Sequence, residues 1–144
     1  MQILTIITSI ILFVALVVIT WNRLSQFDAK AKIKICTIGI IICLIITILI
    51  FQIASIGIEY VNSNSKGAVM QVITLLFTPI NGIVCLPYLA KILDKVKSGE
   101  MKKEEAKKKL IVFTILVVLI IVIEIFYFKD IQNGIMEYAN KIKK

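Results

Sequence analysis

The sequence contains no histidine, and this absence narrows what the chain can do. Histidine is the usual general base near neutral pH, the commonest zinc ligand and a common axial ligand of haem, so these uses are excluded. The three cysteines, Cys36, Cys43 and Cys85, form no CxxC pair and lie inside apolar runs. On one helix, Cys36 and Cys43 would stand about 10 Å apart, which is too far for a disulfide.

Acidic residues are also scarce, because nine Asp and Glu stand against seventeen Lys and Arg, for a formal net charge of +8. We find no paired carboxylates within reach of one substrate, no Ser, His and Asp set, and no glycine-rich phosphate loop. We therefore expect a protein that is not an enzyme and needs no cofactor or metal. Basic residues are not interleaved with aromatic ones, so we expect no nucleic-acid partner.

Apolar residues are in excess: they make up 59% of the chain, and the mean hydropathy is +0.96. In soluble domains, apolar residues make up about 45–50% of the chain. The apolar residues form four runs, at residues 3–21, 35–58, 68–89 and 110–128. Each has the roughly 17–25 residues that a spanning helix needs, and none alternates in polarity as a barrel strand would. The sequence thus predicts one all-α domain, residues 1–144, folded as an integral membrane four-helix transmembrane bundle.

Positive charges gather in two of the connecting segments. Four follow the first run and eight follow the third: Arg23, Lys30, Lys32 and Lys34, then Lys91, Lys95, Lys97, Lys102, Lys103, Lys107, Lys108 and Lys109. The positive-inside rule places both segments in the cytoplasm and both termini outside. The same Lys-rich loops can bind anionic lipid headgroups. Abundant Ile and Lys indicate an AT-rich, prokaryotic source, so we expect the plasma membrane.

Two polar segments are expected to extend the bundle. The third span should continue as a helix to Gly99, which can end it in the left-handed conformation, and turn back into the fourth span. This predicts a cytoplasmic helical hairpin extension between spans three and four. The tail, residues 130–144, has apolar residues at helical spacing, which predicts an interfacial amphipathic helix, with a frayed end as the alternative.

The third span carries a polar face, with Gln71, Thr74, Thr78, Asn81, Cys85 and Tyr88 spaced at intervals of three and four. In lipid such a face should meet neighbouring helices or a wet cavity, so it either lines a pore or forms a packed core. The same span contains Pro79, Gly82 and Pro87. Because proline lacks an amide donor, these residues predict a kink or a site-forming break.

The second and fourth spans add two further features. Gly39, Cys43 and Thr47 stand four residues apart, and such small residues allow close helix packing. Glu124 is the single carboxylate well inside a predicted span, where it either forms a proton or cation site or extends to the nearby interface. The candidate intramembrane polar cluster is Gln52, Gln71, Thr74, Thr78, Asn81 and Glu124.

Four functions are compatible with these features. The first is a subunit of a membrane complex of the transport, secretion or conjugation type, partnered by other membrane chains. The second is a homo-oligomeric pore or holin-like protein, in which the polar face of the third span lines the pore. The third is a small ion-coupled transporter that uses Glu124. The fourth is a membrane immunity or exclusion protein.

Overall fold

The computed structural model describes residues 2–57 and 63–143, and the regular structure in these residues is helical throughout. The helices are α1 (Gln2–Arg23), α2 (Ala29–Ala54), α3 (Ser63–Ser98) and α4 (Lys103–Lys143). Each is long and apolar enough to cross a membrane. The prediction of an all-helical chain with four apolar helices is therefore confirmed.

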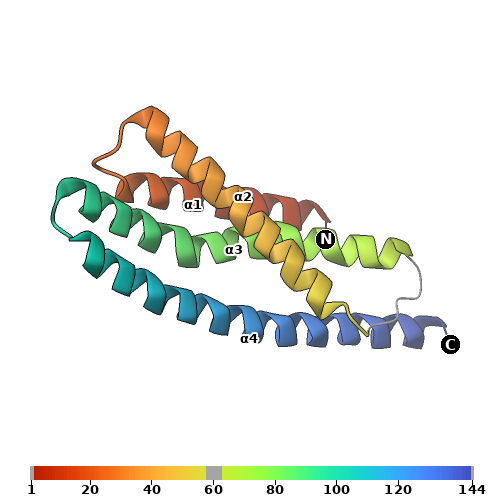
Figure 1. Cartoon of the computed structure of the whole chain (residues 1–144). Coiled ribbons are helices and arrows are strands. Elements are labelled where there is room, and N and C mark those ends of the chain that lie inside the picture. Colours follow the sequence, from red (N-terminus) through yellow and green to blue (C-terminus); the bar gives the residue numbers. More distant parts are fainter. Residues whose placement is uncertain (1, 58–62, 144) are drawn as a thin grey trace.

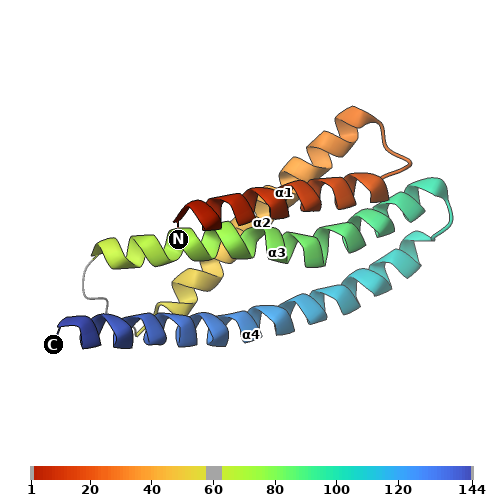
Figure 2. The same ribbon diagram turned by 180° about the vertical axis from the view of Figure 1, so that it is seen from behind.

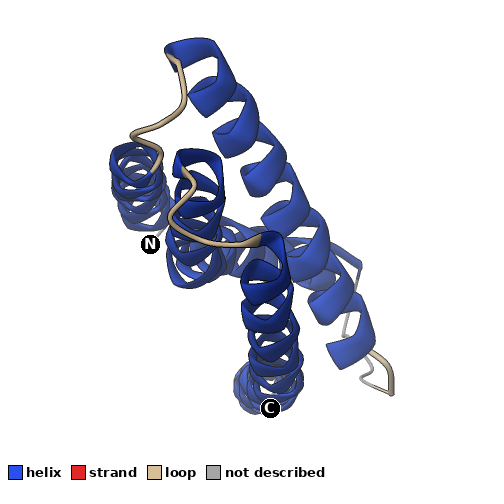
Figure 3. Ribbon diagram, turned by 60° about the vertical axis from the view of Figure 1, so that its left-hand side comes forward, coloured by secondary structure: helices blue, strands red, loops and turns tan. Residues whose placement is uncertain are grey.

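The helices form a row with one helix laid across it. Figure 3 shows α3 between α1 and α4, while α2 crosses α3 obliquely from the side of α1 to the side of α4. The α1–α2 and α3–α4 connections lie at the same end of the molecule, and both chain termini lie toward the other end (Figures 1 and 2). The two Lys-rich regions are thus brought to one end, because two helices that run in opposite directions, α2 and α3, lie between them (Figure 1).

The second helix is shifted relative to the predicted run. It begins at Ala29, because Asp28 caps it by accepting a hydrogen bond from the amide of Ala31 at 2.9 Å. It ends at Ala54 and not at residue 58, as the sequence predicted. The Ser55 hydroxyl lies 2.8 Å from the Phe51 carbonyl and 3.2 Å from Oε1 of Gln132, so the turn after the helix is tied to α4.

The third helix extends past its apolar run to Ser98, where Gly99 adopts a φ of 82° and ends it as expected. The α1–α2 loop docks on this extension: Asp94 accepts hydrogen bonds from the Ser25 hydroxyl at 2.8 Å and the Gln26 amide at 2.6 Å. These contacts hold the two connections together at one end of the molecule.

The tail is helical but does not form a separate helix, because α4 runs without interruption from Lys103 to Lys143. At the end of the apolar run and beyond it, Phe128 and Gln132 are buried against the end of α2. This packing continues across the point where a separate helix was predicted to begin. Gly134 is accommodated inside α4 with no side chain within 4 Å of the place where its Cβ would be.

Both prolines of α3 lie inside a continuous helix, so of the two predicted alternatives at Pro79, Gly82 and Pro87, a kink or a break, the structure has no break. The helix instead bends near its middle (Figure 2). Pro79 has no amide hydrogen for the carbonyl of Leu75, four residues earlier. The hydroxyl of Ser9 on α1 donates to that carbonyl, and this bond compensates for the missing helical one.

Two glycines let three helices approach closely. A Cβ on Gly82 would stand 2.6 Å from Cδ2 of Leu16, and one on Gly39 would stand 2.5 Å from Cδ2 of Leu86. The leucine of α1 therefore fills a hollow in α3, and the leucine of α3 fills a hollow in α2. Gly39, Cys43 and Thr47 are all buried, so the small-residue ridge of α2 lies at this helix contact.

Candidate functional site

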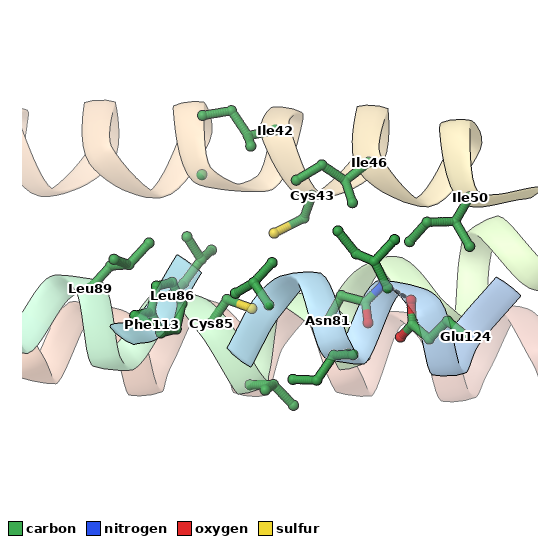
Figure 4. Close-up of a pocket in the computed structure, with 15 residues that line it drawn as sticks. Ile42, Cys43, Ile46, Ile50, Asn81, Cys85, Leu86, Leu89, Phe113 and Glu124 are labelled. Carbon is green, nitrogen blue, oxygen red and sulfur yellow. Dashed lines mark hydrogen bonds between the residues drawn. The ribbon is translucent and has the colours of Figure 1, made fainter. Parts of the chain in front are cut away.

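A pocket of about 150 Å³ lies between α2, α3 and α4. In Figure 4 the side chains of Asn81 and Glu124 stand at one end, Leu89 and Phe113 stand at the other, and Cys43 and Cys85 lie between. We call it the Glu124 pocket. Its lining is almost entirely apolar and comprises Gly39, Ile42, Cys43, Ile46, Ile50, Asn81, Val84, Cys85, Leu86, Leu89, Phe113, Val117, Ile120, Ile121 and Glu124.

Three polar side chains from three helices meet at one end of this pocket. The amide nitrogen Nδ2 of Asn81 lies 3.2 Å from the Thr47 hydroxyl and 3.4 Å from Oε2 of Glu124. Thr47 donates its own proton to the carbonyl of Cys43 at 2.8 Å. Its oxygen is therefore free to accept from Asn81, and the two amide hydrogens of Asn81 serve two acceptors. These hydrogen bonds therefore connect α2, α3 and α4 at one end of the pocket.

In the part of the chain that the structure describes, no cation pairs with the Glu124 carboxylate. Within residues 2–57 and 63–143, the side-chain ion pair found is that of Lys109 and Glu105, on the exposed surface of α4. Oxygen Oε1 of Glu124 also has no hydrogen-bond donor among the described residues. Glu124 thus presents one free carboxylate oxygen in apolar surroundings, where a charge is costly unless it is paired or neutralised by a proton.

The pocket exists because α4 does not pack closely on α3 in this region. The predicted fourth span, residues 110–128, contains no Gly, Ala or Ser. Branched and aromatic side chains hold the two helix backbones apart, whereas small residues would let them approach. Phe113, which lines the end of the pocket away from Glu124 (Figure 4), stacks on Tyr88 of α3 with the ring centroids 5.1 Å apart.

The structure brings together only part of the predicted polar cluster. Asn81 donates a hydrogen bond to Glu124, so these two members of the predicted cluster do lie together. Thr78 is buried, and its hydroxyl and that of Thr74 have no hydrogen-bond partner among the described residues, but neither residue lines the Glu124 pocket. Gln52 and Gln71 are exposed, so they lie outside the group. Gln71 instead lines a groove of about 180 Å³ between α1 and α3.

Sequence reasoning missed two polar contacts. Thr47 was assigned to helix packing, yet it also joins Asn81. Ser9 was given no role from the sequence, yet its hydroxyl donates a hydrogen bond to the Leu75 carbonyl. The second contact could have been predicted in part from the sequence. Pro79 has no amide hydrogen, so the carbonyl of Leu75, four residues earlier, needs another donor.

Among the described residues, no group of three or more Cys, Asp or Glu side chains is placed to hold a metal ion. The thiols of Cys36, Cys43 and Cys85 are free. Comparison of the chain with protein-family models, with curated proteins and with solved structures gave no match. The arguments for function therefore rest on the physical features of the chain.

Proposed function

We propose that the chain is a multi-pass protein of the plasma membrane that serves as a subunit of a membrane complex of the transport, secretion or conjugation type. It catalyses no reaction of its own. Both termini lie outside and both Lys-rich connections lie in the cytoplasm, where they meet anionic lipid headgroups. The observation that carries the proposal is the exposure of α4.

The apolar part of α4 is the least buried of the four apolar segments within the chain. None of the residues in its most apolar 18-residue window is buried, against 28% in the corresponding windows of α2 and of α3. Ile111, Ile115 and Ile123 are each more than half exposed, with 62%, 57% and 66% of their surface accessible. Lipid can cover such a helix, but a second transmembrane chain covers it more specifically. Helix α4 is therefore the proposed contact with the partner chain.

Photo-crosslinking in native membranes tests this proposal. A photoreactive residue at Ile115 or Ile123 of α4 should give a crosslink to one defined second polypeptide. The matched control is Ile45 of α2, which is similarly exposed at 52% but lies on another helix, and which should crosslink mainly to lipid. Crosslinks to lipid alone at every position, with a monomer after mild detergent extraction, would contradict the proposal.

Crosslinks between copies of the same chain would instead favour the homo-oligomeric pore. The structure gives this alternative little support, because Thr78 is only 1% exposed and Asn81 bonds to its own chain. The middle of the polar face of α3 is thus turned into the bundle rather than presented to other copies, although Gln71 and Tyr88 toward its two ends are exposed. No separate feature favours the immunity or exclusion protein.

The Glu124 pocket favours a second candidate function, a small ion-coupled transporter. Glu124 offers a free carboxylate oxygen inside the bundle, and Asn81 orients the other oxygen. If Glu124 couples transport, Glu124→Gln should abolish flux into reconstituted vesicles while the variant elutes as the parent chain does. Unchanged flux in that variant would remove this candidate.

A further inference from the structure

We propose that the Glu124 pocket binds a small organic cation with an apolar body, such as a protonated amine attached to a single aromatic ring. The proposal rests on the site of the second candidate function and names the class of molecule that the site recognises. It concerns binding only, so it can hold even if the chain transports nothing.

Charge complementarity is the first argument. The lining residues contribute one carboxylate, that of Glu124, and no Lys or Arg. The other titratable groups that face the pocket are the thiols of Cys43 on α2 and Cys85 on α3. An unpaired carboxylate is costly in apolar surroundings, so the pocket favours either a proton on Glu124 or a cation beside it. An ammonium group provides both a positive charge and hydrogen-bond donors for the free oxygen Oε1.

Size and shape supply the second argument. An apolar cavity of about 150 Å³ in a protein interior can hold a benzene ring. The Glu124 pocket has this volume and is lined by Leu89 and Phe113 at the end away from the carboxylate (Figure 4). A molecule with a cationic group at one end and a single ring at the other matches the division of the pocket into a polar and an apolar end.

Access from the membrane is the third argument. Two lining side chains, Ile42 on α2 and Val84 on α3, are 50% and 52% exposed, so the pocket reaches the surface of the chain. In a bilayer that surface faces lipid, into which amphipathic amines partition. A purely apolar occupant such as an acyl chain would leave oxygen Oε1 of Glu124 without a partner, and for this reason we favour the cation.

Binding of the cation exchanges one positive charge for another. When Glu124 carries a proton in the empty pocket, that proton leaves for the solvent as the ammonium nitrogen pairs with the carboxylate. No other bond is made or broken. Binding should therefore release protons into a weakly buffered solution, which a neutral molecule of the same shape would not do.

Equilibrium binding of radiolabelled benzylamine to the purified full chain in lipid nanodiscs tests the inference. We expect one saturable class of sites, proton release on binding, and much weaker competition by benzyl alcohol, which is similar in shape but uncharged. Glu124→Gln should weaken binding on the order of tenfold to a hundredfold, because a hydrogen bond to a charged group usually contributes that much to affinity. Glu137→Gln, which removes a carboxylate from the exposed end of the same helix, should leave binding unchanged.

A pair of variants on α4 keeps the test decisive if Glu124→Gln fails to fold. Val117 lines the pocket, whereas Leu119 is 54% exposed and does not. Val117→Phe should therefore block binding and Leu119→Phe should not. Equal binding of benzylamine by Glu124→Gln and the parent chain would overturn the inference. So would equal binding of benzylamine and benzyl alcohol, which would identify an apolar pocket for lipid chains.

Discussion

Helix α3 packs tightly against α1 on one side and stands apart from α4 on the other. Against α1, a hollow at Gly82 receives Leu16, and Ser9 bonds to the Leu75 carbonyl. Toward α4, the contact includes the Glu124 pocket and the stacked rings of Tyr88 and Phe113. In the proposed bilayer, helix association at either contact gains little from the hydrophobic effect. The difference shows that small residues and paired polar groups decide which helices pack closely.

The largest expected effect comes from filling the hollow on the tight side. Gly82→Leu places a side chain where Leu16 already lies, so we expect a loss of about 1–3 kcal/mol in the free energy of unfolding. Stability can be measured by SDS titration of the chain in mixed micelles. Gly67→Leu is the matched control, because Gly67 lies in the same helix with nothing within 4 Å of its Cβ position. Equal losses in the two variants would refute the close contact.

An intermediate effect should come from the polar bond on the tight side. Ser9→Ala leaves the Leu75 carbonyl without its donor, which should cost about 1 kcal/mol. In a Pro79→Ala background the new amide of residue 79 can serve that carbonyl, so Ser9→Ala should cost less there. A double-mutant cycle in the same titration measures this coupling. Additive losses would show that Ser9 does not compensate for Pro79.

The smallest effect is expected on the loose side. Leu119 of α4 is 54% exposed, whereas Leu16 of α1 is 1% exposed. Leu119→Ala shortens an exposed side chain and should change the free energy of unfolding by less than about 0.5 kcal/mol. Leu16→Ala empties the hollow at Gly82 and should cost more than about 1 kcal/mol. Similar losses would mean that α4 is as closely packed as α1.

The number of helices could be predicted because lipid demands long apolar helical runs, and the sequence has four. Helix ends were harder to predict, because they depend on tertiary contacts. Helix α2 stops where the Ser55 hydroxyl bonds back to Phe51 and reaches Gln132. Helix α4 continues past Phe128 because its packing against α2 continues to Gln132.

The candidate site could be predicted only in part, because it too depends on tertiary contacts. Asn81 and Glu124 stood out because polar residues are unusual inside apolar spans. Which face of each helix turns inward could not be read from hydropathy, since these helices are apolar almost all round. Gln52 and Gln71 were therefore grouped with Glu124 although both are exposed, and Thr47 was left out although it bonds to Asn81.

The account depends most on the four helices crossing a bilayer so that both Lys-rich connections face the same compartment. Single cysteines at Ser25, in the α1–α2 connection, and at Gly99, in the α3–α4 connection, can be introduced into a chain without its native thiols and treated with a membrane-impermeant maleimide. In intact cells both should stay unlabelled, and in inverted vesicles both should react. Labelling of one connection from outside and the other from inside would contradict the four-span arrangement.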